Sequence, residues 1–183
     1  MEGLFKIDKI DGKGFGWIAL RDIKAGTLIY KEKHQFVPPR MVSDSTRGSF
    51  LDLMNSFYAM SENDQKEYLE LHNAYLDLNS LPDVEKKWYF DIKNTSEDFE
   101  FRKQVPLHLG IQIPCFDSNL VLKIMCINST NAFKGDGGVG IKVSRINHSC
   151  CPNSQNCEWE GEMEIRATSK ILEGQEITTR DHP

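Results

Sequence analysis

Short runs in which apolar and polar residues alternate lie near the N-terminus. These runs read LFKIDKI, FGWIAL and TLIYKEK, and the glycine-containing stretches DGKG and IKAG separate them. A period of two residues is typical of strands with one buried face, and glycine between such runs is typical of tight turns. The pattern therefore predicts a small β-meander within about residues 1–40.

From about residue 45 the apolar spacing changes to three and four residues. The positions that show it are Phe50, Leu51, Met54, Phe57 and Tyr58. This spacing predicts an amphipathic helix. Ser61 is a suitable N-cap for a second helix, ENDQKEYLELHNAYL, with an acidic first turn, and Ser118 for a third helix that ends near residue 127. We expect a mostly helical insertion over about residues 41–135.

Strand-like runs return in the last third of the chain. They are GVGIKVS, then CEWEGEMEIRATSKI with a turn at Glu160-Gly161, and finally QEITT. Strands at both ends of a chain with a helical middle imply that distant segments pair in space. We predict a single α+β domain over residues 1–183, whose small β-sheets combine the N-terminal part with about residues 136–179.

Composition narrows the class of protein. The chain has 183 residues, of which 39% are hydrophobic and 27% charged, and this suits one sizeable core. A net charge of −5 without a basic block argues against direct nucleic-acid binding. No run approaches the roughly 20 apolar residues of a membrane span, and no secretory signal opens the sequence. We expect an intracellular protein, and nothing decides between nucleus and cytoplasm.

Five cysteines form an odd set, so we expect reduced thiols instead of a disulfide framework. Cys150 and Cys151 are adjacent and Cys157 follows six residues later, a spacing that disfavours a closed zinc site. A Cys-His nucleophile with His148 stays open, although such pairs usually need a third, orienting group. We expect these thiols to be buried and inert.

Two further stretches carry candidate chemistry. GKGFG, residues 12–16, lacks the helix and the Lys-Ser/Thr pair of a phosphate-binding loop, but its glycines allow a close backbone approach to a ligand. In NHSCCPN, Asn147 and His148 offer donors and acceptors, and Pro152 fixes a bend that can hold them inward. Taken alone, these residues suit either a binding site or a loop whose polar groups satisfy one another.

The order of the motifs resembles the SET-domain family of protein-lysine methyltransferases. GKGFGWIALRDIKAG is similar to the family's Gly-x-Gly strand and A-x-R-x-I-x-x-G turn, RINHSCCPN to its Asn-His-Ser-Cys-x-Pro-Asn motif, and ILEGQEIT to its last strand. STNAF followed by GDGGVGI also resembles the subgroup that combines SET with a MYND zinc module, without the MYND cysteines. The resemblance implies a SET-like fold with a C-terminal pseudoknot near Asn147 and His148.

The same resemblance implies transfer of a methyl group from S-adenosyl-L-methionine to a lysine side chain of a protein or peptide. It also implies the residues that hold this cofactor, which are Gly14, Phe15, Gly16, Trp17, Asn131, Asn147 and His148. Aromatic and neutral polar groups suit the adenine and the sulfonium, because a cation is attracted to the face of an aromatic ring.

The resemblance ends at Thr179. Asp181 stands where the family has a tyrosine that orients the amine, and a carboxylate is shorter, charged and not aromatic, so no catalytic residue is assigned. In many relatives the cysteine equivalent to Cys150 binds zinc with cysteines of a post-SET segment that is absent here, so no metal is predicted. The chain is then either an enzyme truncated at its C-terminus or a catalytically inactive SET-like module that binds a protein segment.

Overall fold

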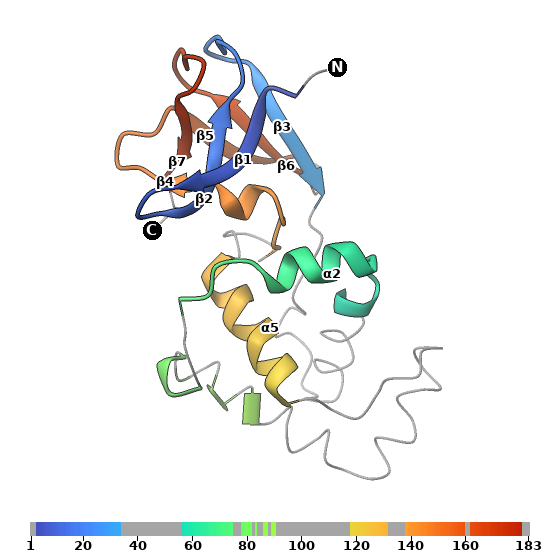
Figure 1. Ribbon diagram of the computed structural model, residues 1–183. Helices are drawn as coiled ribbons and strands as arrows, with labels where there is room; N and C mark the ends of the chain where they lie inside the picture. Colours follow the sequence, from blue (N-terminus) through green and yellow to red (C-terminus); the bar gives the residue numbers. More distant parts are fainter. Residues whose placement is uncertain are drawn as a thin grey trace. The chain divides into compact units, whose positions relative to one another are not determined.

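A computed structural model describes residues 3–33, 56–74, 78–81, 83, 86, 87, 89, 90, 118–131, 138–159 and 162–180 (Figure 1). The chain divides into two compact units. The first combines residues 1–35 with 139–183, and the second consists of residues 36–138. These limits lie close to the predicted boundaries near residues 40 and 135. That the whole chain is a single domain stays a prediction.

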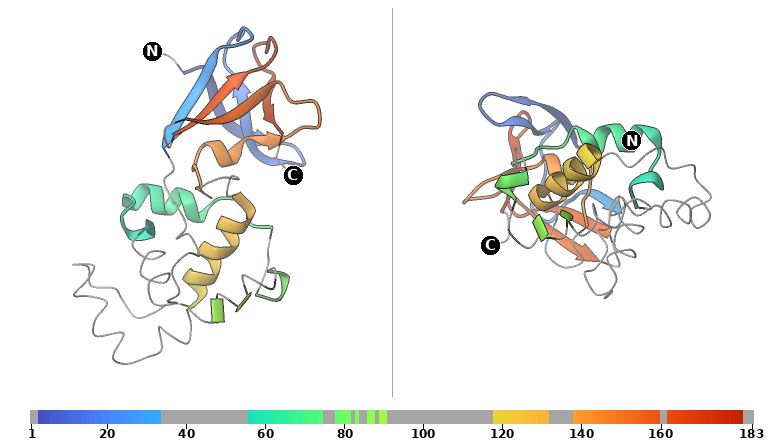
Figure 2. Two further views of the ribbon diagram at one scale, coloured as in Figure 1. Left: turned by 180° about the vertical axis from the view of Figure 1, so that it is seen from behind. Right: turned by 90° about the horizontal axis from the view of Figure 1, so that it is seen from below.

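The first unit contains two small β-sheets. In the first sheet the order is β1-β2-β7-β4, with strands Phe5–Ile10, Gly14–Ala19, Glu176–Thr179 and Asn147–His148. In the second sheet the order is β3-β6-β5, with strands Leu28–Lys33, Glu162–Ala167 and Ser154–Trp159. Figures 1 and 2 show the blue N-terminal strands beside the orange and red C-terminal strands. The predicted pairing between the two ends of the chain is confirmed.

Alternating burial explains why these runs form strands. In β6 the side chains of Met163, Ile165 and Ala167 are buried, and the residues between them are partly exposed. Trp17 of β2 pairs with Ile177 of β7, and both are fully buried. Burial of one such side chain contributes about 1.5–3 kcal/mol, which helps to offset the entropy lost when distant segments are brought together.

The predicted strand over residues 138–144 is wrong. The chain turns there and enters η2, a 3-10 helix at Val143–Arg145. The backbone N–H groups of Lys142 and Val143 donate to the carboxylate of Glu32 in β3. Buried backbone donors need partners, and a side chain from a distant strand supplies them here instead of a sheet neighbour. Local alternation could not reveal this contact.

The second unit contains helices α2 (Glu62–Leu69) and α5 (Ser118–Asn131) and the short 3-10 helix η1 (Leu78–Ser80). The predicted N-cap of α2 is confirmed, because Ser61 Oγ accepts from the N–H of Asp64 at 3.2 Å. Of the predicted helix around residues 50–58, only 56–58 are described, and they are helical. The α+β class is confirmed by these helices together with the two sheets.

Both helices differ from their predicted lengths. The prediction for α2 extends to residue 76, but the helix ends at Leu69. Beyond it, the N–H of Leu71 donates to Tyr68 O, three residues earlier, as in a 3-10 turn. By contrast, α5 continues past residue 127 to Asn131. Thr130 Oγ1 donates to Cys126 O, one turn earlier, so side-chain bonds support this extension. None of the helices in the described ranges has the length and apolar character to cross a membrane.

Candidate functional site

The three sequence motifs meet in one sheet. Strand β7, from the C-terminal motif, pairs on one side with β2, which carries the Gly-x-Gly residues, and on the other with β4, which is Asn147–His148. The β2–β7 pair is antiparallel, and the β4–β7 pair is parallel with Asn147 opposite Thr178 and His148 opposite Thr179. Segments from opposite ends of the chain are therefore neighbours at this site.

Glycine is required at two positions of GKGFG for two different physical reasons. Gly14 has a φ of 78°, in the left-handed region that favours glycine. Gly16 instead needs space: a Cβ there would lie 2.6 Å from Asn147 Nδ2 and would also clash with the side chain of Ile10. The missing side chain of Gly16 therefore lets β2 pack directly against the Asn147 amide.

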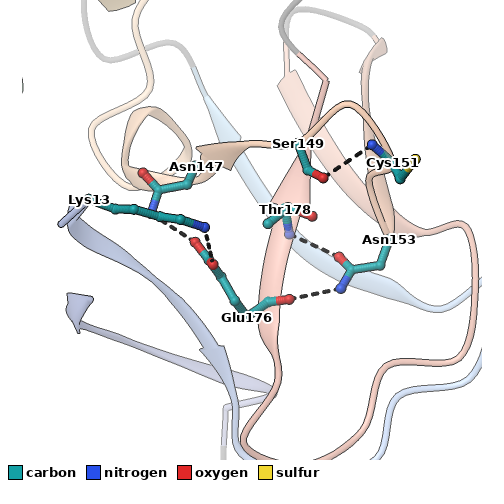
Figure 3. A network of polar contacts seen from close by, with 7 residues as sticks. All are labelled: Lys13, Asn147, Ser149, Cys151, Asn153, Glu176 and Thr178. Atoms are coloured by element: carbon teal, nitrogen blue, oxygen red, sulfur yellow. Dashed lines mark hydrogen bonds and ion pairs between the residues drawn. The ribbon is translucent and has the colours of Figure 1, made fainter. Parts of the chain in front are cut away.

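Glu176 joins the three motifs. Its Oε1 accepts from Asn147 Nδ2 at 2.9 Å, and its Oε2 forms an ion pair with Lys13 Nζ at 2.7 Å. Its backbone carbonyl accepts from Asn153 Nδ2 at 2.8 Å. Figure 3 shows Lys13 and Asn147 approaching the Glu176 carboxylate, while Asn153 reaches the backbone of β7. This side chain therefore fixes the orientation of the Asn147 amide.

Asn153 and Ser154 attach the loop after β4 to β7. Asn153 Oδ1 accepts from the N–H of Thr178 at 2.9 Å, in addition to the bond that Asn153 Nδ2 donates. Ser154 Oγ donates to Thr178 O at 2.9 Å, and Ser154 is fully buried. The second half of the NHSCCPN motif thus has a structural role, and the first half, Asn147–His148, lies at the predicted binding edge.

The two aromatic residues of the first motif differ in accessibility. Phe15 has 45% of its surface exposed and lies under the guanidinium of Arg145, at 5.1 Å from the ring centroid. Trp17 is fully buried, stacks on Phe5 at 3.6 Å, and donates from Nε1 to Lys142 O at 3.0 Å. A ligand at this strand would meet the ring of Phe15 but only the backbone of Trp17.

His148 is exposed, and its Nε2 lies 3.6 Å from Cys150 Sγ. Cys150, Cys151 and Cys157 are exposed as well, so the prediction that these thiols are buried is wrong. The thiols are exposed because the buried side chains of this loop are those of Asn153 and Ser154. Within the described residues, no group of three or more His, Cys, Asp or Glu side chains is placed to hold a metal ion.

Asn131 and Asp181 stand outside the part of the first unit that the structure describes. Asn131 is the last residue of α5 in the second unit, and its Nδ2 donates to Ile127 O at 2.7 Å and His72 O at 2.8 Å. Its predicted contact with a cofactor stays a prediction. Asp181 lies outside the described residues, as does the predicted turn at residues 160 and 161.

Sequence reasoning missed Glu176 as a site residue. It stands within the quoted ILEGQEIT motif, but its partners Lys13 and Asn147 are far from it along the chain. The available signal was a carboxylate inside a strand otherwise made of apolar and hydroxyl residues. An ionisable residue at a strand position usually needs a partner when it is partly buried.

The geometry of this unit, two small sheets in which β2, β7 and β4 carry the three motifs as neighbours, indicates the class of protein. The model of the SET domain family matches residues 14–180. This chain belongs to the SET domain family.

One relative and two structures of a second protein illustrate the similarity. The chain is 29% identical over 178 residues to a SET domain-containing protein of Acanthamoeba polyphaga mimivirus, and the match covers 92% of this chain and 63% of that protein. The structure of Rubisco LSMT bound to AdoMet matches with a TM-score of 0.62 at 13% identity, over 99% of this chain and 49% of that one. The structure of Rubisco LSMT bound to sinefungin and monomethyllysine matches with a TM-score of 0.57 at 13% identity. That match covers 98% of this chain and 48% of the other. The chain thus spans under two thirds of these relatives, and the structural likeness shows the fold.

Proposed function

We propose that this domain binds S-adenosyl-L-methionine at the β2–β7–β4 edge and transfers its methyl group to a lysine side chain of a protein. The observation that carries the proposal is the convergence of Gly14–Trp17 and Asn147–His148 on β7. The resemblance of these motifs to the SET family supports it, as do the cofactor and lysine analogue named for Rubisco LSMT.

The residues at this edge suit such a ligand. Phe15 presents an exposed aromatic ring, which attracts a cation such as a sulfonium. Thr179 is paired with His148, and its buried Oγ1 has no hydrogen-bond partner among the described residues. A buried hydroxyl without a partner is costly, and a polar ligand group would satisfy it. A Cβ added at Gly14 would meet nothing within 4 Å, so a ligand can approach the backbone closely there.

Methyl transfer of this kind requires little acid or base catalysis from the protein. The bound cofactor supplies an activated methyl group, and the amine must arrive with a free lone pair. An ordinary lysine has a pKa near 10.4 and is protonated at neutral pH, so the site has to favour its neutral form. Desolvation and a nearby cation both lower the pKa of an amine. The protein then orients the amine nitrogen toward the methyl carbon, and orientation alone can supply much of the rate.

A second candidate function is a catalytically inactive module that binds a protein segment. The observation in its favour is Asp181 at the position of the family tyrosine. That the chain is part of a longer enzyme, and that it is nearest to the SET part of SET-and-MYND proteins, are further proposals based on its motifs. The two candidate functions share the fold and differ in methyl transfer.

Cofactor binding is tested first with Asn147→Ala and His148→Ala, by isothermal titration of S-adenosyl-L-methionine. Each change removes polar groups at the proposed edge, and we expect the dissociation constant to rise about tenfold. Gln155→Ala, at an exposed position of β5, is the matched control and should leave affinity unchanged. Unchanged affinity in both site variants would reject this location for the cofactor.

Methyl transfer is tested with a tritiated methyl donor and a mixture of lysine-containing proteins. The substitution Asp181→Tyr, joined to a closing segment from a relative, restores the missing hydroxyl and aromatic wall. If the chain is a damaged enzyme, we expect labelled protein only after this change. Cofactor binding without label, before and after the change, supports the inactive module.

A further inference from the structure

Glu32 lies outside the three motifs but has an unusual environment. Among the described residues it is the only buried charged side chain, with 8% of its surface exposed. Its carboxylate accepts from Lys142 N at 3.2 and 3.3 Å and from Val143 N at 3.1 Å. These are the first N–H groups of the turn into η2, which have no partner within a helix of this kind. A carboxylate in this place acts as a cap supplied by a distant strand.

Both backbone polar groups of Lys142, the N–H and the carbonyl, form hydrogen bonds to side chains of two strands. Glu32 accepts from its N–H, and the indole Nε1 of Trp17 donates to its carbonyl oxygen at 3.0 Å. Glu32 belongs to the β3 sheet and Trp17 to the β2 sheet, so this one residue is tied to both sheets. Its ammonium also lies over the ring of Tyr30, 5.6 Å from the centroid.

The space beneath the turn is shaped for this contact. A Cβ on Gly140 would lie 2.8 Å from Glu32 Oε2 and would also clash with the end of Met163. The turn is closed internally by bonds from Ser144 N to Gly140 O and from Ile146 N to Val143 O. Ile146 is buried, and the next residue is Asn147. The turn therefore leads directly into β4 with little freedom.

We propose that Glu32 is a positioning residue for the cofactor site, because its carboxylate anchors the turn that sets the place of Asn147 and His148 beside β7. This inference rests on the proposed function and adds a residue that touches neither cofactor nor substrate. Two backbone donors depend on Glu32, so its loss leaves them unsatisfied and releases the turn from β3. Gln at this position keeps one oxygen for them.

The binding test compares Glu32→Ala with Glu32→Gln by titration of S-adenosyl-L-methionine. We expect the dissociation constant to rise about tenfold in the alanine variant and to stay within about threefold in the glutamine variant. Glu164→Gln controls for loss of charge in the neighbouring strand, where the carboxylate contacts Arg166 and Lys31. Ile165→Val, a destabilising change in the core of the same sheet, controls for general loss of stability.

The structural test needs no cofactor. In ¹H–¹⁵N spectra of Glu32→Ala we expect faster amide exchange at Lys142 and Val143 and shifted signals for Asn147 and His148. Wild-type affinity in the alanine variant, an equal loss in Ile165→Val, or unmoved Asn147 and His148 signals would overturn the assignment. If the wild-type chain binds no cofactor while these signals move, the proposed function fails and the positioning contact stands.

Discussion

At the scale of single residues, the site depends on small groups whose partners are far away in the chain. Gly16 leaves room for the Asn147 amide, and Glu176 then holds that amide through a hydrogen bond. The sequence motifs identify Gly16 and Asn147 as candidate site residues. Only their contact explains why the first residue has to be glycine, since its backbone φ does not lie in the left-handed region.

Gly16→Ala is expected to destabilise the protein by about 1–3 kcal/mol, because a Cβ has to displace Asn147 or Ile10 in a packed region. Urea denaturation followed by circular dichroism measures this change. Gly3→Ala is the matched control: its Cβ would meet only Phe5 O, at 3.4 Å, and should change stability by less than about 0.5 kcal/mol. Equal stability of the two variants would contradict the packing argument.

Glu32 should make stability depend on pH. Burial raises the pKa of this carboxyl, and the N–H groups of Val143 and Lys142 and the Lys142 ammonium offset the rise only in part. The folded chain therefore holds the Glu32 proton more tightly than the unfolded chain does. The resulting contribution to stability is fully present below the unfolded pKa and is lost as pH rises through the folded pKa.

Glu32→Gln, which stays neutral, should therefore gain stability relative to the wild type as pH rises above the unfolded pKa of the Glu32 carboxyl. Urea titrations of both proteins at several pH values measure the gap in the free energy of unfolding. The expected gap widens toward neutral pH. A gap that narrows with rising pH would mean that the hydrogen bonds outweigh burial at this carboxyl.

At the scale of elements, β7 is a four-residue strand that depends on its neighbours. It pairs with β2 and β4, and Asn153 bonds both the Glu176 carbonyl and the Thr178 N–H. A strand this short has few bonds of its own, so side-chain bonds from the adjoining loop contribute a large share of its stability. Similar reasoning applies to η2, where the Glu32 carboxylate replaces sheet pairing.

Asn153→Ala should cost about 1–3 kcal/mol, because it leaves the buried N–H of Thr178 without an acceptor. Hydrogen exchange at Thr178 is the direct measurement and should become faster. Gln155→Ala lies two residues away on β5 at an exposed position and should leave this exchange unchanged. Slow exchange at Thr178 in the Asn153 variant would show that the strand does not need this side chain.

At the scale of the whole molecule, the first unit is assembled from the two ends of the chain. Trp17 pairs with Ile177, and Lys31 with Glu164, so its sheets close across the whole intervening insertion. Non-local pairing of this kind slows folding, because loop-closure entropy is lost before the contacts form. Helix α5, by contrast, is built from contacts within one segment.

Refolding should therefore show the burial of Trp17 later than the formation of helix. Trp88→Phe and Trp159→Phe leave Trp17 as the single tryptophan, and its fluorescence then reports closure of the β2–β7 pair. Stopped-flow fluorescence is compared with far-ultraviolet circular dichroism. A single phase that coincides in both signals would contradict this order of events.

Local features could be predicted from the sequence, because they depend on neighbours along the chain. Alternation placed the strands near residues 5–33 and 154–179, Ser61 marked the start of α2, and the order of three motifs indicated the SET family. These signals are local, since a strand's buried face, a cap and a motif are each contained in a few consecutive residues.

Features that depend on partners far along the chain could be seen only in the folded sheets. The run at 138–144 alternates like a strand but turns, because Glu32 supplies acceptors for its N–H groups. Trp17 is enclosed by Phe5 and Tyr30, whereas Cys150 is exposed, and neither follows from residue type. Burial and hydrogen-bond partners are properties of the assembled sheets, and they come into existence only when both ends of the chain meet.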